Sequence, residues 1–135
     1  MIRATLDTNI FVSAFNFGGL CSQIIDRYEA EEFILCLSQS MIDEVRRVLV
    51  EYFDWTSSDI AEIFDPLVSA AEVVTPKERI KACDDPDDDQ ILECAVEAEA
   101  HVIVTGDDDL LRMKRFRGIE ILDPRTFLES KIGRS

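Results

Sequence analysis

The stretch Ile2-Arg3-Ala4-Thr5-Leu6-Asp7-Thr8-Asn9 decides how the rest of the sequence is interpreted. Its apolar start predicts a short strand over residues 2–7, and that strand ends on an acid followed by two polar residues. Aspartate and asparagine are ordinary at the end of a strand or the start of a helix. The stretch therefore indicates a functional site only together with three further acids, which also lie at the ends of predicted elements.

Length and composition predict one globular domain over residues 1–135. With 47% hydrophobic and 31% charged residues, the chain is long enough to bury a core without disulfides or structural metals. No apolar run approaches the roughly 20 residues that a membrane span needs, and the N-terminal residues lack the pattern of a signal peptide. We therefore expect a cytoplasmic protein that does not enter a membrane.

The cysteines do not have the spacing of a zinc site. Cys21, Cys36, Cys83 and Cys94 form no Cys-x-x-Cys pair, and His101 is the one histidine of the chain. We expect reduced thiols, with Cys36 and Cys94 packing as small apolar side chains.

The net charge of −14 disfavours a protein that binds nucleic acid through a basic face. The acids are also concentrated locally: residues 84–89 hold five aspartates around a proline, and residues 107–109 are three aspartates in a row. Carboxylates this close repel one another unless a cation lies among them. An acidic protein can still bind a phosphodiester when metal ions join the two.

Apolar runs and helical periodicity alternate along the chain. Strands are predicted at residues 2–7, 33–37, 72–75, 101–105 and 119–122. Helices are predicted at residues 10–17 (one or two turns), 22–30, 41–53, 57–71 (with a restart at Asp65-Pro66), 87–98, 110–113 and 124–130. This alternation predicts an α/β domain with a mostly parallel sheet and right-handed crossovers.

The four acids are expected at one edge of that sheet. Asp7 ends the first strand, and Asp107 follows the strand at residues 101–105. Glu44 lies early in the helix after the second strand, about 40° outside its apolar arc. Asp89 lies in the first turn of the helix after the third strand. Ligands of parallel sheets bind at the carboxyl ends of the strands, near the topological switch point.

Several carboxylates at one edge, without a nearby lysine, cysteine or Ser–His pair, indicate hard divalent cations. Mg²⁺ and Mn²⁺ prefer oxygen ligands, among them carboxylates, water and substrate phosphate. One such ion can lower the pKa of a bound water, and a second, roughly 3.5–4 Å away, can stabilise the leaving oxygen. The pattern predicts a metal-dependent nuclease.

At this point the motifs resemble the PIN-domain family, and most closely its VapC-like toxins from toxin–antitoxin pairs. The matching motifs are Leu6-Asp7-Thr8-Asn9, Glu44, the run from Asp85 to Ala95 and the run from Val104 to Leu111. The resemblance implies a single-domain α/β/α sandwich and a Mg²⁺- or Mn²⁺-dependent endoribonuclease acting on RNA. It also implies an antitoxin protein as partner and a homodimer.

Carried over by position, the resemblance assigns the metal-binding and catalytic acids as Asp7, Glu44, Asp89 and Asp107. Asn9 and Thr105 match polar residues that support the first and last of these acids.

Two of these placements compete with neighbouring acids. Asp87 or Asp88 could replace Asp89, although the pattern Asp89-x-x-Leu92-x-x-Ala95 favours Asp89. Asp109 could share the role of Asp107, although Thr105-x-Asp107 is the better match.

A basic run follows the last acidic motif and offers candidates for substrate contact: Arg112, Lys114, Arg115 and Arg117. The same run would also suit a solvated helix end, where cations interact favourably with the helix dipole.

The sequence also has to be weighed against functions of other classes. A haloacid-dehalogenase-like phosphatase needs Asp-x-Asp, but Asn9 holds the second position here, and the lysine it needs cannot be placed. The paired acids and late lysine of a response-regulator receiver do not line up. A catalytically inactive PIN fold that only binds, and an RNA-processing PIN nuclease outside any toxin–antitoxin pair, both remain compatible with the sequence.

Overall fold

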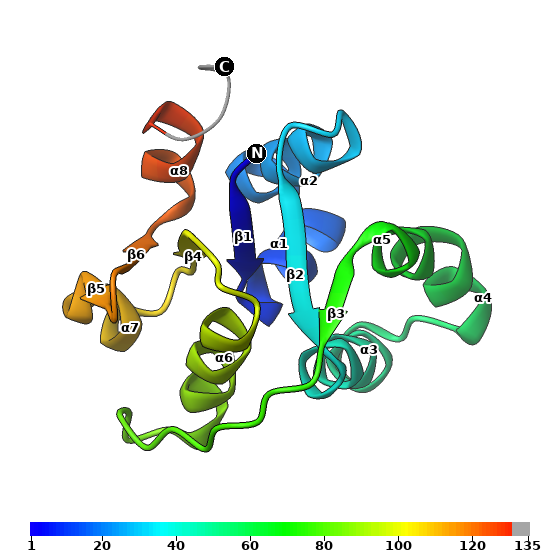
Figure 1. Ribbon diagram of the computed structural model, residues 1–135. Helices are drawn as coiled ribbons and strands as arrows, with labels where there is room; N and C mark the ends of the chain where they lie inside the picture. Colours follow the sequence, from blue (N-terminus) through cyan, green and yellow to red (C-terminus); the bar gives the residue numbers. More distant parts are fainter. Residues whose placement is uncertain (131–135) are drawn as a thin grey trace.

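The computed structural model describes residues 1–130, so residues 131–135 of the predicted domain lie outside the described residues. Six strands form one sheet with the order β3-β2-β1-β4-β6-β5 (Figure 1). The strands are β1 (Arg3–Leu6), β2 (Ile34–Ser38), β3 (Glu72–Val74), β4 (Val102–Val104), β5 (Arg115–Phe116) and β6 (Ile119–Leu122). Every pair is parallel except β5 with β6. The predicted α/β fold with a mostly parallel sheet is confirmed.

Helices connect and cover the strands. They are α1 (Thr8–Phe17), α2 (Gly19–Glu29), α3 (Gln39–Phe53), α4 (Ser57–Asp59), the π-helix η1 (Ile60–Phe64), α5 (Asp65–Ala70), α6 (Pro86–Glu97), α7 (Asp108–Met113) and α8 (Pro124–Ser130). None of the described helices has both the length and the apolar character that a membrane crossing requires.

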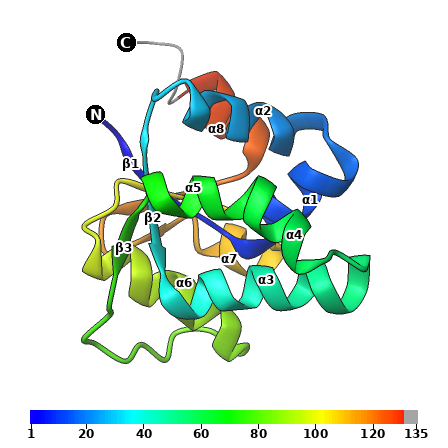
Figure 2. The ribbon, with the colours of Figure 1, turned by 90° about the vertical axis from the view of Figure 1, so that its right-hand side faces the viewer.

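The connections place helices on both faces of the sheet. The chain moves from β1 through β2 to β3 in one direction and then crosses back to β4. Because such crossovers are right-handed, the reversal transfers the connecting helix to the opposite face. Accordingly α6 packs on β1, β2 and β4, whereas α1 and α2 pack against each other behind the sheet (Figure 1). The last helix, α8, returns to lie beside α2 (Figure 2).

The switch point of the sheet lies between β1 and β4, which are buried at every position except Arg3. The side chains of Ala4, Leu6 and residues 102–104 are fully excluded from solvent. Strands covered on both faces have continuous apolar sequences, which explains the lack of strict alternation here. The carboxyl ends of β1 and β4 are therefore held by the centre of the core.

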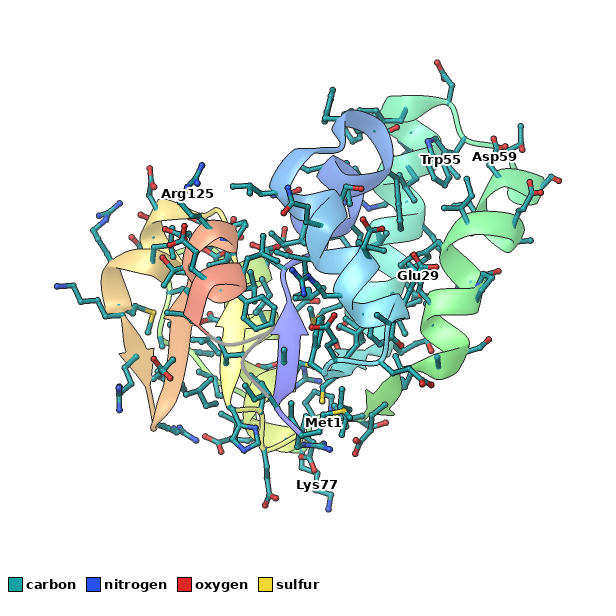
Figure 3. The ribbon with its side chains drawn as sticks, turned by 90° about the horizontal axis from the view of Figure 1, so that it is seen from above. Met1, Glu29, Trp55, Asp59, Lys77 and Arg125 are labelled. Carbon is teal, nitrogen blue, oxygen red and sulfur yellow. The ribbon has the colours of Figure 1, made fainter. Side chains whose placement is uncertain are left out.

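Side chains of serine and threonine cap the starts of α3 and α4. The Ser38 hydroxyl caps α3 by accepting a hydrogen bond from the backbone N–H of Met41 at 3.4 Å. Thr56 and Asp59 form a reciprocal capping box at α4. Figure 3 shows Asp59 at the same end of the molecule as Trp55, whose indole N–H donates to Asn16 at 3.1 Å.

The structure corrects several predicted elements. The helices predicted to begin at residues 10, 22, 41 and 110 begin two or three residues earlier, at residues 8, 19, 39 and 108. Asp65 does not cap a new helix, because the chain stays helical through the π turn of η1 and places Pro66 in the first turn of α5. The helix expected to begin near Asp87 or Asp88 begins at Pro86 and is capped by Asp85. The two-residue strand β5 was missed, since its Arg115-Phe116 pair is too short to show a period.

We expect the central strand to carry more stability than the edge strand. Ile103→Ala in β4 empties a fully buried site and should lower the free energy of unfolding by about 2–5 kcal/mol. Val73→Ala in the edge strand β3, where 46% of the residue is exposed, should lower it by less than about 1 kcal/mol. Urea denaturation followed by circular dichroism measures both, and equal losses would contradict this account of the core.

Candidate metal centre

Asp7 lies at the carboxyl end of β1 and is 4% exposed. Its Oδ1 accepts hydrogen bonds from the Thr8 hydroxyl at 3.3 Å and from the backbone N–H of Asn9 at 3.4 Å. Its Oδ2 accepts a hydrogen bond from the Thr105 hydroxyl at 2.6 Å. Burial raises the pKa of Asp7, these bonds lower it in part, and the charge of Asp107 raises it again.

Thr105 joins the ends of the two central strands. It follows β4, is fully buried, and donates its hydroxyl proton to Asp7 while its oxygen accepts the backbone N–H of Asp107 at 3.0 Å. The supporting position predicted for Thr105 thus lies between the two acids that it was expected to support. The side chain of Asn9 is exposed, and it is the backbone amide of this residue that bonds Asp7.

Asp107 caps the start of α7 and lies within a cluster of three carboxylates. Its Oδ1 accepts the backbone N–H of Asp109 at 2.9 Å. One oxygen each from Asp88, Asp107 and Asp109 lie within 4.8 Å of one another. Asp88 is buried, Asp107 half-buried and Asp109 exposed, so the cluster opens toward solvent at Asp109.

The protonation of Asp88 reflects the crowding of this cluster. Burial is the largest cause that raises the pKa of Asp88 to about 7, followed by its contact with Asp107 and by the charges of Asp107, Asp85 and Asp7. A divalent cation among these oxygens would replace the shared protons and allow the acids to ionise together. The donors are all hard oxygens, which fits Mg²⁺ or Mn²⁺.

Asp89, the predicted ligand of α6, bonds the loop that precedes this helix. Its Oδ1 accepts the backbone N–H groups of Ala82 at 3.0 Å and Cys83 at 2.8 Å, in the loop before α6. Asp88 instead points toward Asp107. Helix phase explains the difference, because Asp88 is seven residues before Ala95 and so lies within about 20° of it around the helix.

Glu44 approaches the same edge from the second turn of α3. Burial raises the pKa of its carboxyl, followed by the charge of Asp87, whereas interaction with the Thr8 hydroxyl lowers it. The charge of Asp7 raises the same pKa, so both acids share one electrostatic environment. Arg47 lies one turn further along α3, with its Nη2 3.9 Å from Glu44 Oε1.

The two remaining candidate acids, Asp87 and Asp109, have separate positions. Asp87 is exposed on the first turn of α6, and its backbone N–H bonds the carboxylate of Asp85 at 2.9 Å. It lines the same small hollow as Glu44, and its charge raises the pKa of Glu44. Asp109 lies in the cluster and also pairs with Arg112.

The residues of the basic run predicted for substrate contact lie in different environments in the structure. Arg112 is joined to the acids through its ion pair with Asp109. Lys114 ends α7, and Arg115 begins the edge strand β5. Arg117 pairs with both carboxylate oxygens of Glu78, at 2.9 and 2.7 Å.

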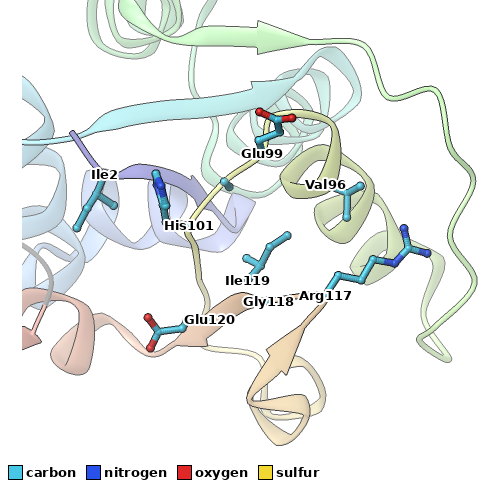
Figure 4. A pocket seen from close by; sticks show the side chains of 9 residues that line it. Ile2, Val96, Glu99, His101, Arg117, Gly118, Ile119 and Glu120 are labelled. Atoms are coloured by element: carbon cyan, nitrogen blue, oxygen red, sulfur yellow. The ribbon is translucent and has the colours of Figure 1, made fainter.

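Pocket size does not identify the site. A hollow of about 550 Å³ lies at the amino ends of the strands, where Ile2, His101 and Ile119 line it (Figure 4). A smaller one of about 310 Å³ lies between α3 and α6 beside the acids. The carboxylates that can bind a cation lie in the smaller hollow and in the cluster next to it.

The chain is similar to known proteins over most of its length. A family model described as PIN domain matches residues 3–109. An uncharacterized protein of Methanocaldococcus jannaschii is 29% identical over 119 residues, which cover 84% of this chain and 76% of that protein. The structure of VapBC2 from Rickettsia felis, bound to a DNA fragment from its promoter, matches with a TM-score of 0.60 and 15% identity. That match covers 90% of this chain and 98% of the other, and at this identity it supports the fold alone.

We expect Thr105→Val to lower the free energy of unfolding at pH 7 by about 1.5–3 kcal/mol, because a buried carboxylate loses a hydrogen-bond donor. The same change should raise the pKa of Asp7 further and weaken Mn²⁺ binding, measured by calorimetric titration. Thr75→Val, at an exposed threonine, is the matched control. Equal effects of the two substitutions would contradict the role given to Thr105.

Separate substitutions of Asp88 and Asp89 test which of the two carboxylates binds the metal ion. Because folding raises the pKa of Asp88 to about 7, the metal-free protein should lose stability as pH rises from about 4 to about 7. Asp88→Asn removes the charge, so it should stabilise the metal-free protein at pH 8 and have little effect at pH 4. It should also weaken Mn²⁺ binding by about tenfold or more.

Asp89→Asn should behave in the opposite way. It weakens the acceptor of two backbone N–H groups and should destabilise the protein at pH 8, while Mn²⁺ affinity changes little. Thermal unfolding and Mn²⁺ titration of both variants provide the comparison. A larger loss of Mn²⁺ affinity in Asp89→Asn than in Asp88→Asn would restore Asp89 as the ligand.

Proposed function

The chain belongs to the PIN-domain family, and on that premise we propose that it is a Mg²⁺- or Mn²⁺-dependent endoribonuclease that hydrolyses RNA phosphodiester bonds. PIN domains are generally nucleases, so the coarser assignment, a hydrolase acting on nucleic acid, follows from the family. One observation carries the finer proposal: the carboxylate oxygens of Asp88, Asp107 and Asp109 converge within 4.8 Å, beside the buried Asp7.

We assign the metal ligands to Asp7, Asp88 and Asp107, with Glu44 as a further ligand on the α3 side and Asp109 on the α7 side of the site. A bound Mg²⁺ or Mn²⁺ would supply a water of lowered pKa and neutralise charge on the phosphate. Thr105 fixes the orientation of Asp7 through Oδ2. Asp88 replaces Asp89 in the set, because the Oδ1 of Asp89 is bonded to loop backbone.

Proton transfer at this edge falls to carboxylates. The one histidine of the chain, His101, precedes β4 and therefore lies at the opposite end of that strand from Asp107. Glu44 is the acid at the side of the site, and burial raises the pKa of its carboxyl. In this proposal a carboxylate at this edge that holds no metal ion accepts the proton of the attacking water.

For the biological role we propose the toxin of a toxin–antitoxin pair. The Rickettsia felis structure with the same fold is a VapBC2 complex. A net charge of −14 suits a basic partner such as an antitoxin by charge complementarity. A homodimer is consistent with the exposed aromatic side chains of Phe17 and Tyr52 at the ends of α1 and α3.

Cleavage of a labelled single-stranded RNA tests the activity. We expect cleavage by the wild-type protein with Mn²⁺ or Mg²⁺, none with excess EDTA, and much slower cleavage of DNA of the same sequence. Asp7→Asn and Asp107→Asn should each lower kcat/KM by at least about a hundredfold, because each removes a ligand charge.

Asp26→Asn, an exposed charge on α2, is the matched control and should keep full activity. Cleavage of RNA by Asp7→Asn at the wild-type rate would overturn the proposal. Hydrolysis of a chromogenic phosphate monoester in place of RNA would favour a phosphatase.

A further inference from the structure

A small pocket adjoins the acids on the side of α3. Its volume is about 310 Å³, and it lies between the amino-terminal parts of α3 and α6. Six residues line it: Ser40, Asp43, Glu44, Arg47, Asp87 and Gln90. Because Glu44 belongs both to this pocket and to the acidic edge, the pocket is continuous with the proposed site of cleavage.

Arg47 is the one cation among the residues that line this pocket. Its Nη2 lies 3.9 Å from Glu44 Oε1, and its Nη1 donates to Glu51 Oε2 at 3.1 Å. Half of the Arg47 side chain is exposed, and Glu51 is more exposed still. An exposed pair of this kind is weak and exchanges readily for another anion.

The charges around Arg47 make its availability depend on Glu44. Three carboxylates line the pocket against one guanidinium, so the metal-free pocket repels a phosphate. A cation bound by Glu44 would withdraw that carboxylate from Arg47 and add positive charge beside it. The guanidinium would then face the pocket with free donors, which suit the oxygens of a phosphate.

A second arginine pairs with an acid on the other side of the site. Arg112 is three residues after Asp109 and pairs with it, as Arg47 is three residues after Glu44. The helices that carry them, α3 and α7, lie on opposite sides of α6 (Figure 1). Each side of the acids therefore has an arginine held by a carboxylate of the site.

We propose that Arg47 binds a backbone phosphate of the RNA next to the cleaved bond, and that it does so once a divalent cation has taken Glu44. This inference rests on the proposed nuclease function. The pocket holds the attached nucleotide, with Ser40 and Gln90 as neutral hydrogen-bonding groups toward its ribose or base. Arg47 is thus a substrate contact that competes with the metal for Glu44 in the absence of RNA.

The competition gives Arg47→Ala two opposite effects. Without RNA, removal of the cation should tighten Mn²⁺ binding by about twofold to fivefold, measured by calorimetric titration. With RNA and saturating Mn²⁺, KM should rise about tenfold while kcat stays within about twofold. The slope of log kcat/KM against log salt should also become shallower by about 0.7, the value for one phosphate contact on a single strand.

Two further variants keep this test independent of folding. Arg47→Lys retains the charge, so it should keep the wild-type Mn²⁺ affinity and give an intermediate KM. Arg27→Ala removes an arginine from an exposed pair with Glu32 on α2 and should leave every measurement unchanged. Thermal unfolding of each variant verifies that it is folded.

The outcomes separate this inference from the proposed function. If the wild-type protein cleaves no RNA, the nuclease proposal fails and takes the RNA contact of Arg47 with it. If the wild-type protein cleaves RNA and the KM of Arg47→Ala stays within about twofold, Arg47 does not bind substrate and only this inference fails. Unchanged or weaker Mn²⁺ affinity in Arg47→Ala would overturn the competition for Glu44.

Discussion

The hydroxyl of Thr105 is the interaction on which the acidic edge depends. It donates to Asp7 at 2.6 Å and accepts the backbone N–H of Asp107 at 3.0 Å, so one oxygen sets the relative position of two acids from neighbouring strands. The parallel pairing of β1 with β4 brings those strand ends together, but pairing alone does not orient a carboxylate. A fully buried threonine that bonds both residues supplies that orientation.

The remaining geometry follows from placing like charges together in a partly buried site. Burial and mutual repulsion raise the pKa values of Asp7, Glu44 and Asp88, which means that the folded chain holds these groups against their preference for the ionised form. Asp7 follows the buried strand β1, whereas Glu44 and Asp88 lie on α3 and α6, which pack on the sheet. Part of the net charge of −14 therefore lies in a site that a cation would stabilise. The charge does not act only by repelling nucleic acid.

The elements that could be predicted from the sequence are those with a local signal. Buried runs such as residues 102–104 indicated the central strands, and the carboxyl-end rule brought Asp7 and Asp107 to one edge. The strand β5 has two residues and no period, and its pairing with β6 depends on the turn between them. The helix continues through η1, where Phe64 packs against Phe11, and no local pattern of Asp65-Pro66 reveals this continuity.

The acidic run at the start of α6 marks the limit of such prediction. Every aspartate from 87 to 89 has the right residue type and lies in the right turn, so only helix phase can choose among them. Counting seven residues back from the buried Ala95 selects Asp88, whereas the spacing of six in Asp89-x-x-Leu92-x-x-Ala95 selects Asp89. The carboxylate of Asp89 is equally buried but is occupied by the loop that leads into its own helix. Arg47 gave no signal at all, because a surface arginine on an amphipathic helix acquires meaning only when the carboxylate one turn away proves to belong to the site.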